Sequence, residues 1–268
     1  MGAVTAALDA TLRRFPAIAL EALGAAQLLD RIDTKFLVDA GAVDALLAAC
    51  VADYEVLDIA GHRRFRYETT YLDDEALALF RAHIAARPER CKVRTRRYAP
   101  SGERWFEVKQ RLRTGRTIKV RVPLPDGAPL PALEAPPFDA VPVGVPSGAL
   151  RPILDVLYER ITLVARDRSE RVTVDLELAW DRAGRRVVAP GWALVELKQA
   201  ARRTSAAWRA LRAFGAVDES VSKYCLGVVA LVPDVPPGYY RQLLKRMGAR
   251  GDLAASGPVT AVPTEPIV

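Results

Sequence analysis

Histidine, methionine, cysteine and long apolar runs are all scarce in this sequence. The 268 residues include two histidines, two methionines and three cysteines. The cysteines stand far apart, so neither zinc-ligand spacing nor a disulfide framework is indicated. With two histidines in the chain, an imidazole metal site or a Ser-His-Asp triad is not expected. No run of 18 apolar residues occurs, and no basic start is followed by an apolar segment. We therefore expect a soluble, cytoplasmic protein.

Lysine is also rare, although the chain is basic. The formal net charge is +7, and only seven of the 39 basic residues are lysines. Six of these seven fall in strand-like segments or in a Ser-Lys-Tyr motif at 222–224. An ammonium is a compact point charge whereas a guanidinium is a planar fork, so the few lysines are informative by position. The basic balance favours an anionic partner, which could be nucleic acid, a membrane surface or a polyanionic small molecule.

The length permits one large or two small domains, and no Pro/Gly/Ser-rich linker divides the chain. We predict one domain over 1–247 and a flexible tail over 248–268. Capping residues and helical spacing predict helices that pack outside a sheet, and prolines predict a long loop over 123–146. The expected helices cover 5–29 (in one or two pieces), 41–50, 75–86, 148–157, 206–214 and 237–247.

Six further segments alternate charged and apolar residues with period two. They are 31–36, 92–97, 105–111, 118–121, 171–177 and 194–198. Any one alone is typical of a half-exposed strand, but together they place ten cations on the charged sheet faces. An α+β fold is predicted, in which helices cover the apolar face of a closed antiparallel β-barrel and the charges point into a tunnel. The acids Asp33, Glu107, Asp175, Glu177 and Glu196 share these faces and could pair with cations or hold a divalent metal.

Inward cations repel one another, so a fold tolerates them only if a strong anion compensates. A triphosphate or a polyphosphate has a suitable charge density and shape, and lysine and arginine bind its oxygens by charge-assisted hydrogen bonds. A few carboxylates could place Mg²⁺ or Mn²⁺. Phosphoryl transfer depends mainly on positioning and charge stabilisation, which suits a chain poor in histidine and activated cysteine.

The ordered motifs of this chain resemble the VTC domain, the polyphosphate polymerase domain of the vacuolar transporter chaperone complex, and its soluble bacterial relatives. These belong to the triphosphate tunnel metalloenzymes, alongside the CYTH phosphohydrolases. The resemblance covers roughly residues 28 to 230. It rests on DRIDTKFLV (30–38), YETTYLDD (67–74), KVRTRRY (92–98), FEVKQR (106–111), YERITL (158–163), RVTVD (171–175), LVELK (194–198) and SKYCLG (222–227).

The resemblance and the strand pattern together assign the candidate site. The expected catalytic residues, which would contact the reacting phosphates, are Lys35, Arg94, Arg96, Lys109 and Lys198. The expected phosphate-binding residues are Lys92, Lys119, Arg121, Arg160, Arg171 and Lys223. Glu196 resembles the metal-binding glutamate for Mn²⁺ or Mg²⁺, with Glu107 and Glu177 as further candidates.

One departure separates the chain from the hydrolase branch. That branch begins with a Glu-x-Glu-x-Lys strand, whereas the corresponding residues here are Arg31, Asp33 and Lys35. The absence of the first carboxylate weakens the case for a two-metal hydrolase and fits the polymerase branch better. Asp33 could still assist a metal or pair with Arg31.

The expected function is transfer of the γ-phosphate of ATP to a growing polyphosphate chain. A tripolyphosphate or nucleoside triphosphate hydrolase and a non-catalytic polyphosphate-binding module are the alternatives. RNA binding is not expected, because aromatics make up 7% of the chain and Phe36 and Phe106 fall on the apolar phase. The expected partners are ATP and polyphosphate. Any membrane partner would be a separate protein, and the oligomeric state stays open.

Overall fold

The computed structural model describes residues 2–25, 32–98, 101–236, 238–248 and 254–256, and combines one large, mainly antiparallel sheet with seven helices in these ranges. The helices are α1 (Gly2–Arg13), α2 (Leu20–Ala25), α3 (Val43–Ala48), α4 (Ala78–Ile84), α5 (Ala206–Ala213), α6 (Lys223–Leu231) and α7 (Gly238–Gly248), with short 3₁₀ turns η1 (Ala40–Ala42) and η2 (Ser147–Ala149). The strands are β1 (Ala17–Ile18), β2 (Ile32–Asp39), β3 (Tyr54–Leu57), β4 (Phe65–Asp73), β5 (Arg90–Tyr98), β6 (Arg104–Arg111), β7 (Thr117–Pro123), β8 (Arg151–Ala165), β9 (Glu170–Arg182), β10 (Arg185–Ala189), β11 (Trp192–Gln199) and β12 (Ala254–Ser256).

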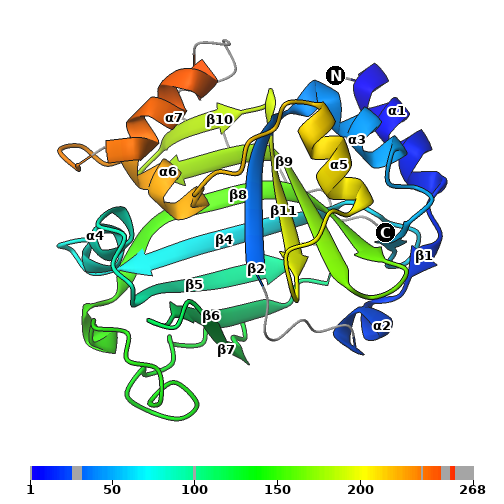
Figure 1. Cartoon of the computed structure of the whole chain (residues 1–268). Coiled ribbons are helices and arrows are strands. Elements are labelled where there is room, and N and C mark those ends of the chain that lie inside the picture. The colour runs from blue at the N-terminus through cyan, green and yellow to red at the C-terminus, as the bar shows by residue number, and fades with distance from the viewer. Residues whose placement is uncertain (1, 26–31, 99–100, 237, 249–253, 257–268) are drawn as a thin grey trace.

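The sheet curls into a half-barrel (Figure 1). Its main path runs β2-β11-β9-β8-β4-β5-β6-β7, with antiparallel pairing throughout. Strand β9 splits its pairing, because its first half joins β11 and its second half joins β10, to which β12 adds. The six strands expected from the alternating pattern are all present, and they supply most of this path.

The predicted closure of the barrel is not observed. Within the described ranges, β2 pairs with β11 and β7 pairs with β6, but no ladder joins β2 to β7. Part of the free edge of β2 is instead occupied by the segment before α6, where Phe36 bridges Asp218 and the Glu219 amide donates to the Lys35 carbonyl at 2.8 Å. Side chains alone span the opening, since Lys109 Nζ on β6 lies 3.2 Å from Asp33 Oδ2 on β2.

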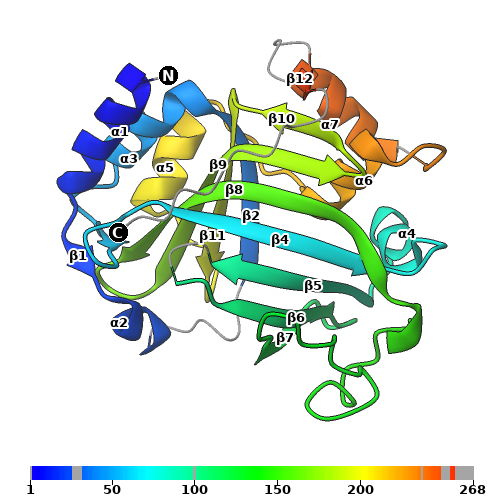
Figure 2. The ribbon, with the colours of Figure 1, turned by 180° about the vertical axis from the view of Figure 1, so that it is seen from behind.

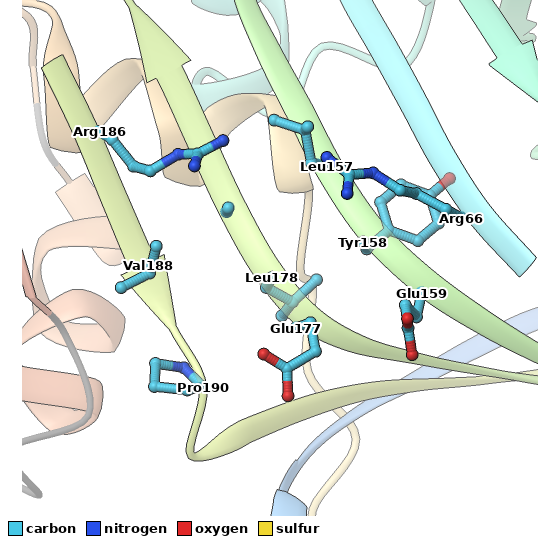
Figure 3. Close-up of a pocket in the computed structure, with 10 residues that line it drawn as sticks. Arg66, Leu157, Tyr158, Glu159, Glu177, Leu178, Arg186, Val188 and Pro190 are labelled. Carbon is cyan, nitrogen blue, oxygen red and sulfur yellow. The ribbon is translucent and has the colours of Figure 1, made fainter. Parts of the chain in front are cut away.

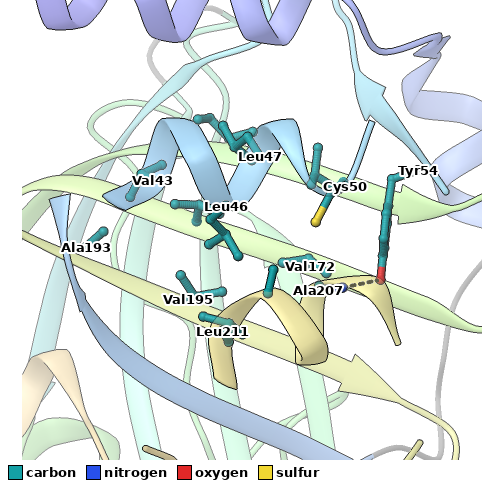
Figure 4. Close-up of a cluster of buried hydrophobic side chains, with 14 of the residues drawn as sticks. Val43, Leu46, Leu47, Cys50, Tyr54, Val172, Ala193, Val195, Ala207 and Leu211 are labelled. Carbon is teal, nitrogen blue, oxygen red and sulfur yellow. Dashed lines mark hydrogen bonds between the residues drawn. The ribbon is translucent and has the colours of Figure 1, made fainter. Parts of the chain in front are cut away.

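Helices α1, α3 and α5 cover one part of the convex face. Alternation places Phe36, Val174 and Val195 on this side, where they join a buried cluster with Leu47 and Leu211. Figure 4 shows α3 and α5 meeting over the strands, with the Ala207 amide donating to Tyr54 Oη at 3.4 Å. The loop after β7 covers β5 and β6 in the same way, through a second cluster with Phe138 at its centre. The convex face of β4 and β8 is left open between these two layers (Figure 2).

Helix α6 packs on the concave face at one end of the half-barrel. Gly227 permits this approach, because a Cβ atom there would lie 2.3 Å from Cδ1 of Trp180. The Trp180 indole donates to the Lys223 carbonyl at 2.8 Å. Tyr224 stacks on Tyr71, with ring centroids 4.9 Å apart, and donates to Asp73 at 2.6 Å. These contacts fix the first turn of α6 against the sheet.

The helix predicted over 148–157 is wrong, because those residues form η2 and the first half of β8. Pro152 disfavours a helix across it, and β-branched residues such as Ile153 and Val156 suit the buried strand that follows. The helices predicted over 41–50, 75–86 and 206–214 are present with shorter bounds, and α7 begins and ends one residue later than predicted. The segment 5–29 contains most of α1, then β1 and α2, and its last four residues lie outside the described ranges. The tail predicted to be flexible over 248–268 lies outside the described residues except for Gly248, which ends α7, and 254–256. No helix within the described ranges is long and apolar enough to cross a membrane.

Candidate functional site

The concave face gathers most of the predicted site residues around four carboxylates. Nine cations of this face lie in or beside the ion-pair groups that these carboxylates form, and they are Lys35, Lys92, Arg94, Arg96, Lys109, Lys119, Arg160, Lys198 and Lys223. The carboxylates are Asp33, Glu107, Asp175 and Glu196. Among these groups, nine cations against four carboxylates leave an excess of five positive charges when every group is ionised. A surface with this imbalance attracts a polyanion.

Glu196 is held between two lysines. Register places it opposite Lys35 on β2, whose Nζ lies 3.3 Å from Glu196 Oε1. Lys198, two residues along β11, lies 2.7 Å from the other oxygen and also donates to Thr173 at 3.1 Å. Burial opposes ionisation of Glu196, but Lys198, Lys35 and Lys109 hold its pKa well below the ordinary value. Its side chain keeps 15% exposure, so a ligand can reach it.

Glu107 has a different environment, because three cations enclose it completely. Arg94 approaches Glu107 Oε2 at 2.6 Å and Arg96 at 3.7 Å, while Lys119 lies 2.5 Å from Oε1. The side chain is 0% exposed. Burial raises the pKa of Glu107, but the three cations lower it by more, so the group stays ionised. In this geometry Glu107 is a counter-ion that spaces the three cations, and its metal-ligand role stays a prediction.

Asp175 anchors the third group, at the α6 end of the concave face. Arg160 binds it with two hydrogen bonds, of 2.6 and 2.8 Å, and Lys223 binds the second oxygen. Burial opposes ionisation, but Arg160 and Lys223 lower the pKa of Asp175 to about 2. Ser222 caps the start of α6 by accepting from the Cys225 amide at 3.3 Å, so the helix start sets the position of Lys223.

Lys92 makes no ion pair with any described carboxylate. Burial lowers its pKa to about 7, Cys225 opposes this change, and the positive charges of Lys35, Lys109 and Arg94 add to it. Burial likewise lowers the pKa of Lys119 and Lys198 to about 8, although Glu107 and Glu196 respectively oppose the change. Lys35 differs, because Glu196 and Asp33 outweigh burial and raise its pKa, with Arg111 opposing them. The free site is therefore electrostatically strained by its own lysines.

Tyrosines that the sequence interpretation did not assign lie beneath the cations. Tyr67 and Tyr158 stack with centroids 5.3 Å apart. The Arg160 guanidinium lies 5.1 Å from the Tyr67 ring, and Lys223 Nζ lies 4.5 Å from the Tyr158 ring. Tyr71 accepts a long hydrogen bond of 3.4 Å from Arg94. Aromatic faces attract cations without neutralising them. The sequence signal that could have predicted this placement is the even spacing of Tyr67 and Tyr71, which puts both on one face of their strand.

Three predicted residues lie away from these groups or at their margin. Arg121 is exposed and rests over the Trp105 ring at 4.3 Å. Arg171 is partly buried and pairs in register with Lys198 on β11. Glu177 is not brought to the concave face, contrary to strict alternation along β9. The ladder with β8 slips there, and the residue takes a left-handed φ of 51°.

The bulge turns Glu177 to the convex side of the sheet. Figure 3 shows it with Arg66 and Arg186 around a pocket of about 320 Å³ on that side. The exposed carboxylate is thus separated from the Glu196 group by the sheet itself. Arg31, the other residue raised as a partner for Asp33, lies outside the described residues.

The donor set can be compared with the needs of a divalent metal. Among the described residues, no three His, Cys, Asp or Glu side chains gather as a protein-only metal cluster would require. The side chains of Glu196 and Asp33 each keep 15% exposure, and Glu196 is the one that strand register places opposite Lys35. Mg²⁺ in phosphate sites commonly uses one or two carboxylates and completes its shell with phosphate oxygens and water. Glu196 fits that pattern, provided that the phosphate is present.

Comparison with known proteins identifies one family. The model of the VTC domain family matches residues 30–134 and 145–232. No curated protein matches the sequence. Among solved structures, HpAC1 from Hippeastrum, described as having a dominant triphosphatase activity, aligns with a TM-score of 0.48 at 14% identity, over 76% of this chain and 98% of its own. A proposed adenylate cyclase from Vibrio parahaemolyticus gives 0.43 at 14% identity, over 73% and 96%. The PH1819 protein from Pyrococcus horikoshii gives 0.42 at 12%, over 73% and 97%.

Proposed function

The chain belongs to the VTC domain family, and on that premise we propose that it is a polyphosphate polymerase that transfers the γ-phosphate of ATP to a polyphosphate chain on its concave face. The observation that carries this proposal is the excess of cations over carboxylates on that face. A linear polyanion is the ligand class that offsets such an excess along a curved surface rather than at one point.

The ion-pair groups around Glu196, Glu107 and Asp175 would each bind a different part of the substrate. Lys35 and Lys198 flank Glu196 and would bind the reacting phosphates, together with Lys109. Arg94 and Arg96, spaced by Glu107, would stabilise the charge on the equatorial oxygens in the transition state. Arg160 and Lys223 would hold the polyphosphate chain at the α6 end of the concave face. Lys92 and Lys119 would bind phosphate oxygens, whose negative charge would raise the pKa of both amines and keep them protonated.

In the proposed step, a terminal oxygen of the acceptor chain attacks the γ-phosphorus of ATP. A new P–O bond forms, the bond between the γ-phosphorus and the β,γ-bridging oxygen breaks, and ADP leaves. The reaction needs no protein nucleophile, because the acceptor oxygen is already anionic at neutral pH. The side chains orient the two chains and neutralise their repulsion, which are the main tasks in phosphoryl transfer.

We propose that Glu196 is the protein ligand of Mn²⁺ or Mg²⁺, with phosphate oxygens completing the coordination. The bound ion would neutralise charge on the leaving diphosphate. Lys35 and Lys198 occupy both oxygens of Glu196 in the free protein, so one of them has to turn toward phosphate when the site is loaded. Glu107, which is enclosed by three cations, is proposed as a structural counter-ion instead.

The test is an assay of purified protein with ATP and either Mn²⁺ or Mg²⁺, analysed for ADP and for a polyphosphate ladder on a gel. The variants Glu196→Gln and Lys35→Met are expected to lose at least about a hundredfold in rate, because each removes a group from the reacting centre. Lys245→Met removes an exposed lysine on α7 and is the matched control.

The products separate the alternatives. A ladder that both variants abolish and the control retains supports the polymerase. Phosphate release without a ladder, from ATP or tripolyphosphate, identifies a hydrolase. Tight binding of tripolyphosphate without turnover of any substrate identifies a non-catalytic module. Either of the last two results contradicts the polymerase.

A further inference from the structure

Strand β5 carries a basic residue, Arg90, that belongs to none of the ion-pair groups around Glu196, Glu107 and Asp175. Its four alternate concave positions are Arg90, Lys92, Arg94 and Arg96. Two residues of a strand advance about 6.7 Å, so this row is about 20 Å long. It is therefore longer than a triphosphate. Arg94 and Arg96 belong to the Glu107 group, whereas Arg90 begins the row at the end near α4.

Like charges face each other across the β5–β6 ladder at that end. Arg90 is opposite Arg111, and Lys92 is opposite Lys109. Directly opposed like charges destabilise a sheet. Of the described carboxylates, none forms an ion pair with Arg90 or Arg111, although the nearby Glu89 pairs with Arg113 at 3.3 Å. An uncompensated cross-strand pair of this kind favours an anion that contacts both guanidinium groups.

Arg90 and Arg111 also lie beside the site rather than apart from it. Arg111 is exposed and acts electrostatically on Lys35. Arg90 is half-buried, donates to the Arg87 carbonyl at 2.7 Å, and is affected first by burial and then by Arg111, both of which lower its pKa. Tyr240 of α7 and Cys225 of α6 are its other electrostatic neighbours. The pair thus stands where the concave face opens beside the C-terminal helices.

We infer that Arg90 and Arg111 form a second phosphate subsite, which binds the part of a linear inorganic polyphosphate that extends beyond the Glu196 and Glu107 groups. This inference rests on the proposed function and adds to it a preference for long chains over tripolyphosphate. The phosphates bound there are remote from the reacting γ-phosphate, so the subsite contributes to affinity and to retention of the growing chain.

The experiment measures equilibrium binding of tripolyphosphate and of a long-chain polyphosphate at fixed ionic strength. The variants are Arg90→Gln, Arg111→Gln and the double variant, with Arg113→Gln as the matched control. Arg113 stands in the same hairpin, is 80% exposed and is already paired with Glu89. We expect the double variant to bind long chains about tenfold more weakly, from about two- to fivefold for each partly exposed contact. Its tripolyphosphate affinity should stay within about twofold of the parent protein.

The two ligands separate this inference from the proposal on which it rests. If the parent protein binds neither ligand, the phosphate site itself is absent and both ideas fail. If it binds tripolyphosphate but the double variant loses both ligands equally, the two arginines act on the whole site and no second subsite exists. If Arg113→Gln weakens long-chain binding as much as the double variant, the effect is general surface charge, and the subsite is again refuted.

Discussion

Lys92 should make the free protein less stable, and its replacement by methionine should reveal this. The side chain is half-buried, and its pKa falls from 10.5 to about 7. That difference corresponds to about 5 kcal/mol against the charged folded state. The residue is partly exposed to solvent, which reduces the effect, so we expect about 2 kcal/mol in practice. Methionine fills a similar volume without the charge, and Lys92→Met should therefore raise the midpoint of thermal unfolding by about 4–8 °C.

The sign of the pH dependence provides a second check on the same variant. Below about pH 7 the amine is protonated in both the folded and unfolded chains, so the destabilisation is fully present. Between pH 7 and 10.5 the unfolded chain binds more protons than the folded one, and the parent protein gains stability as the pH rises. The advantage of Lys92→Met should therefore shrink over this range.

Urea unfolding at several pH values, with and without tripolyphosphate, measures both effects. Tripolyphosphate should stabilise the parent protein more than the variant, because the ligand compensates the charge that the variant lacks. Lys245→Met, on the exposed face of α7, makes the same change in net charge and should have little effect. Equal stability of Lys92→Met and Lys245→Met, or a gain that does not change with pH, would refute the reasoning.

Three further results are expected. Tripolyphosphate affinity should fall by up to about a hundredfold between pH 7 and 9, about tenfold for each of Lys119 and Lys198, because these lysines have pKa values of about 8 and lose the protons that the bound ligand requires. Calorimetry should record proton uptake on binding, and constant affinity would contradict this. Gly227→Ala should destabilise the protein by about 1–3 kcal/mol, because the added methyl group clashes with Trp180. Urea unfolding measures this change, and unchanged stability would mean that α6 shifts to accommodate the methyl group. Glu177→Gln should keep the parent rate within about twofold, since the residue faces the convex side; a large loss would return it to the reacting centre.

The strands of the site were predictable because alternation is a local property of the chain. The shared face of Lys35, Lys109 and Glu196 follows from period two. Strand register then pairs Lys35 with Glu196, whereas Lys109 reaches β2 through its side chain. The pattern could not reveal the slip at Glu177, because a bulge depends on where β9 leaves one partner strand for another. The helix over 148–157 failed for a related reason, since apolar spacing in a short window fits either a helix or a buried strand.

The local environments of the carboxylates also could not be predicted from the sequence. Glu107 and Glu196 occupy equivalent positions in similar alternating strands, yet one is sealed by three cations and the other remains accessible. The difference comes from Arg94, Arg96 and Lys119, which converge from two neighbouring strands. Convergence of this kind depends on curvature and pairing, which no local pattern contains.

The docking of α6 has a consequence for how the protein is made. Tyr224 binds Asp73 across 151 residues of sequence, and Lys223 binds Asp175 across 48. Contacts between distant residues form late, after the intervening chain has been synthesised. A nascent chain that ends before α6 already carries the six basic strands, the last of which ends at Gln199, but it lacks α6 and with it Lys223. The proposed polyanion site therefore acquires its full geometry only after α6 has been synthesised, and products truncated before α6 should compete poorly with the intact chain for polyphosphate.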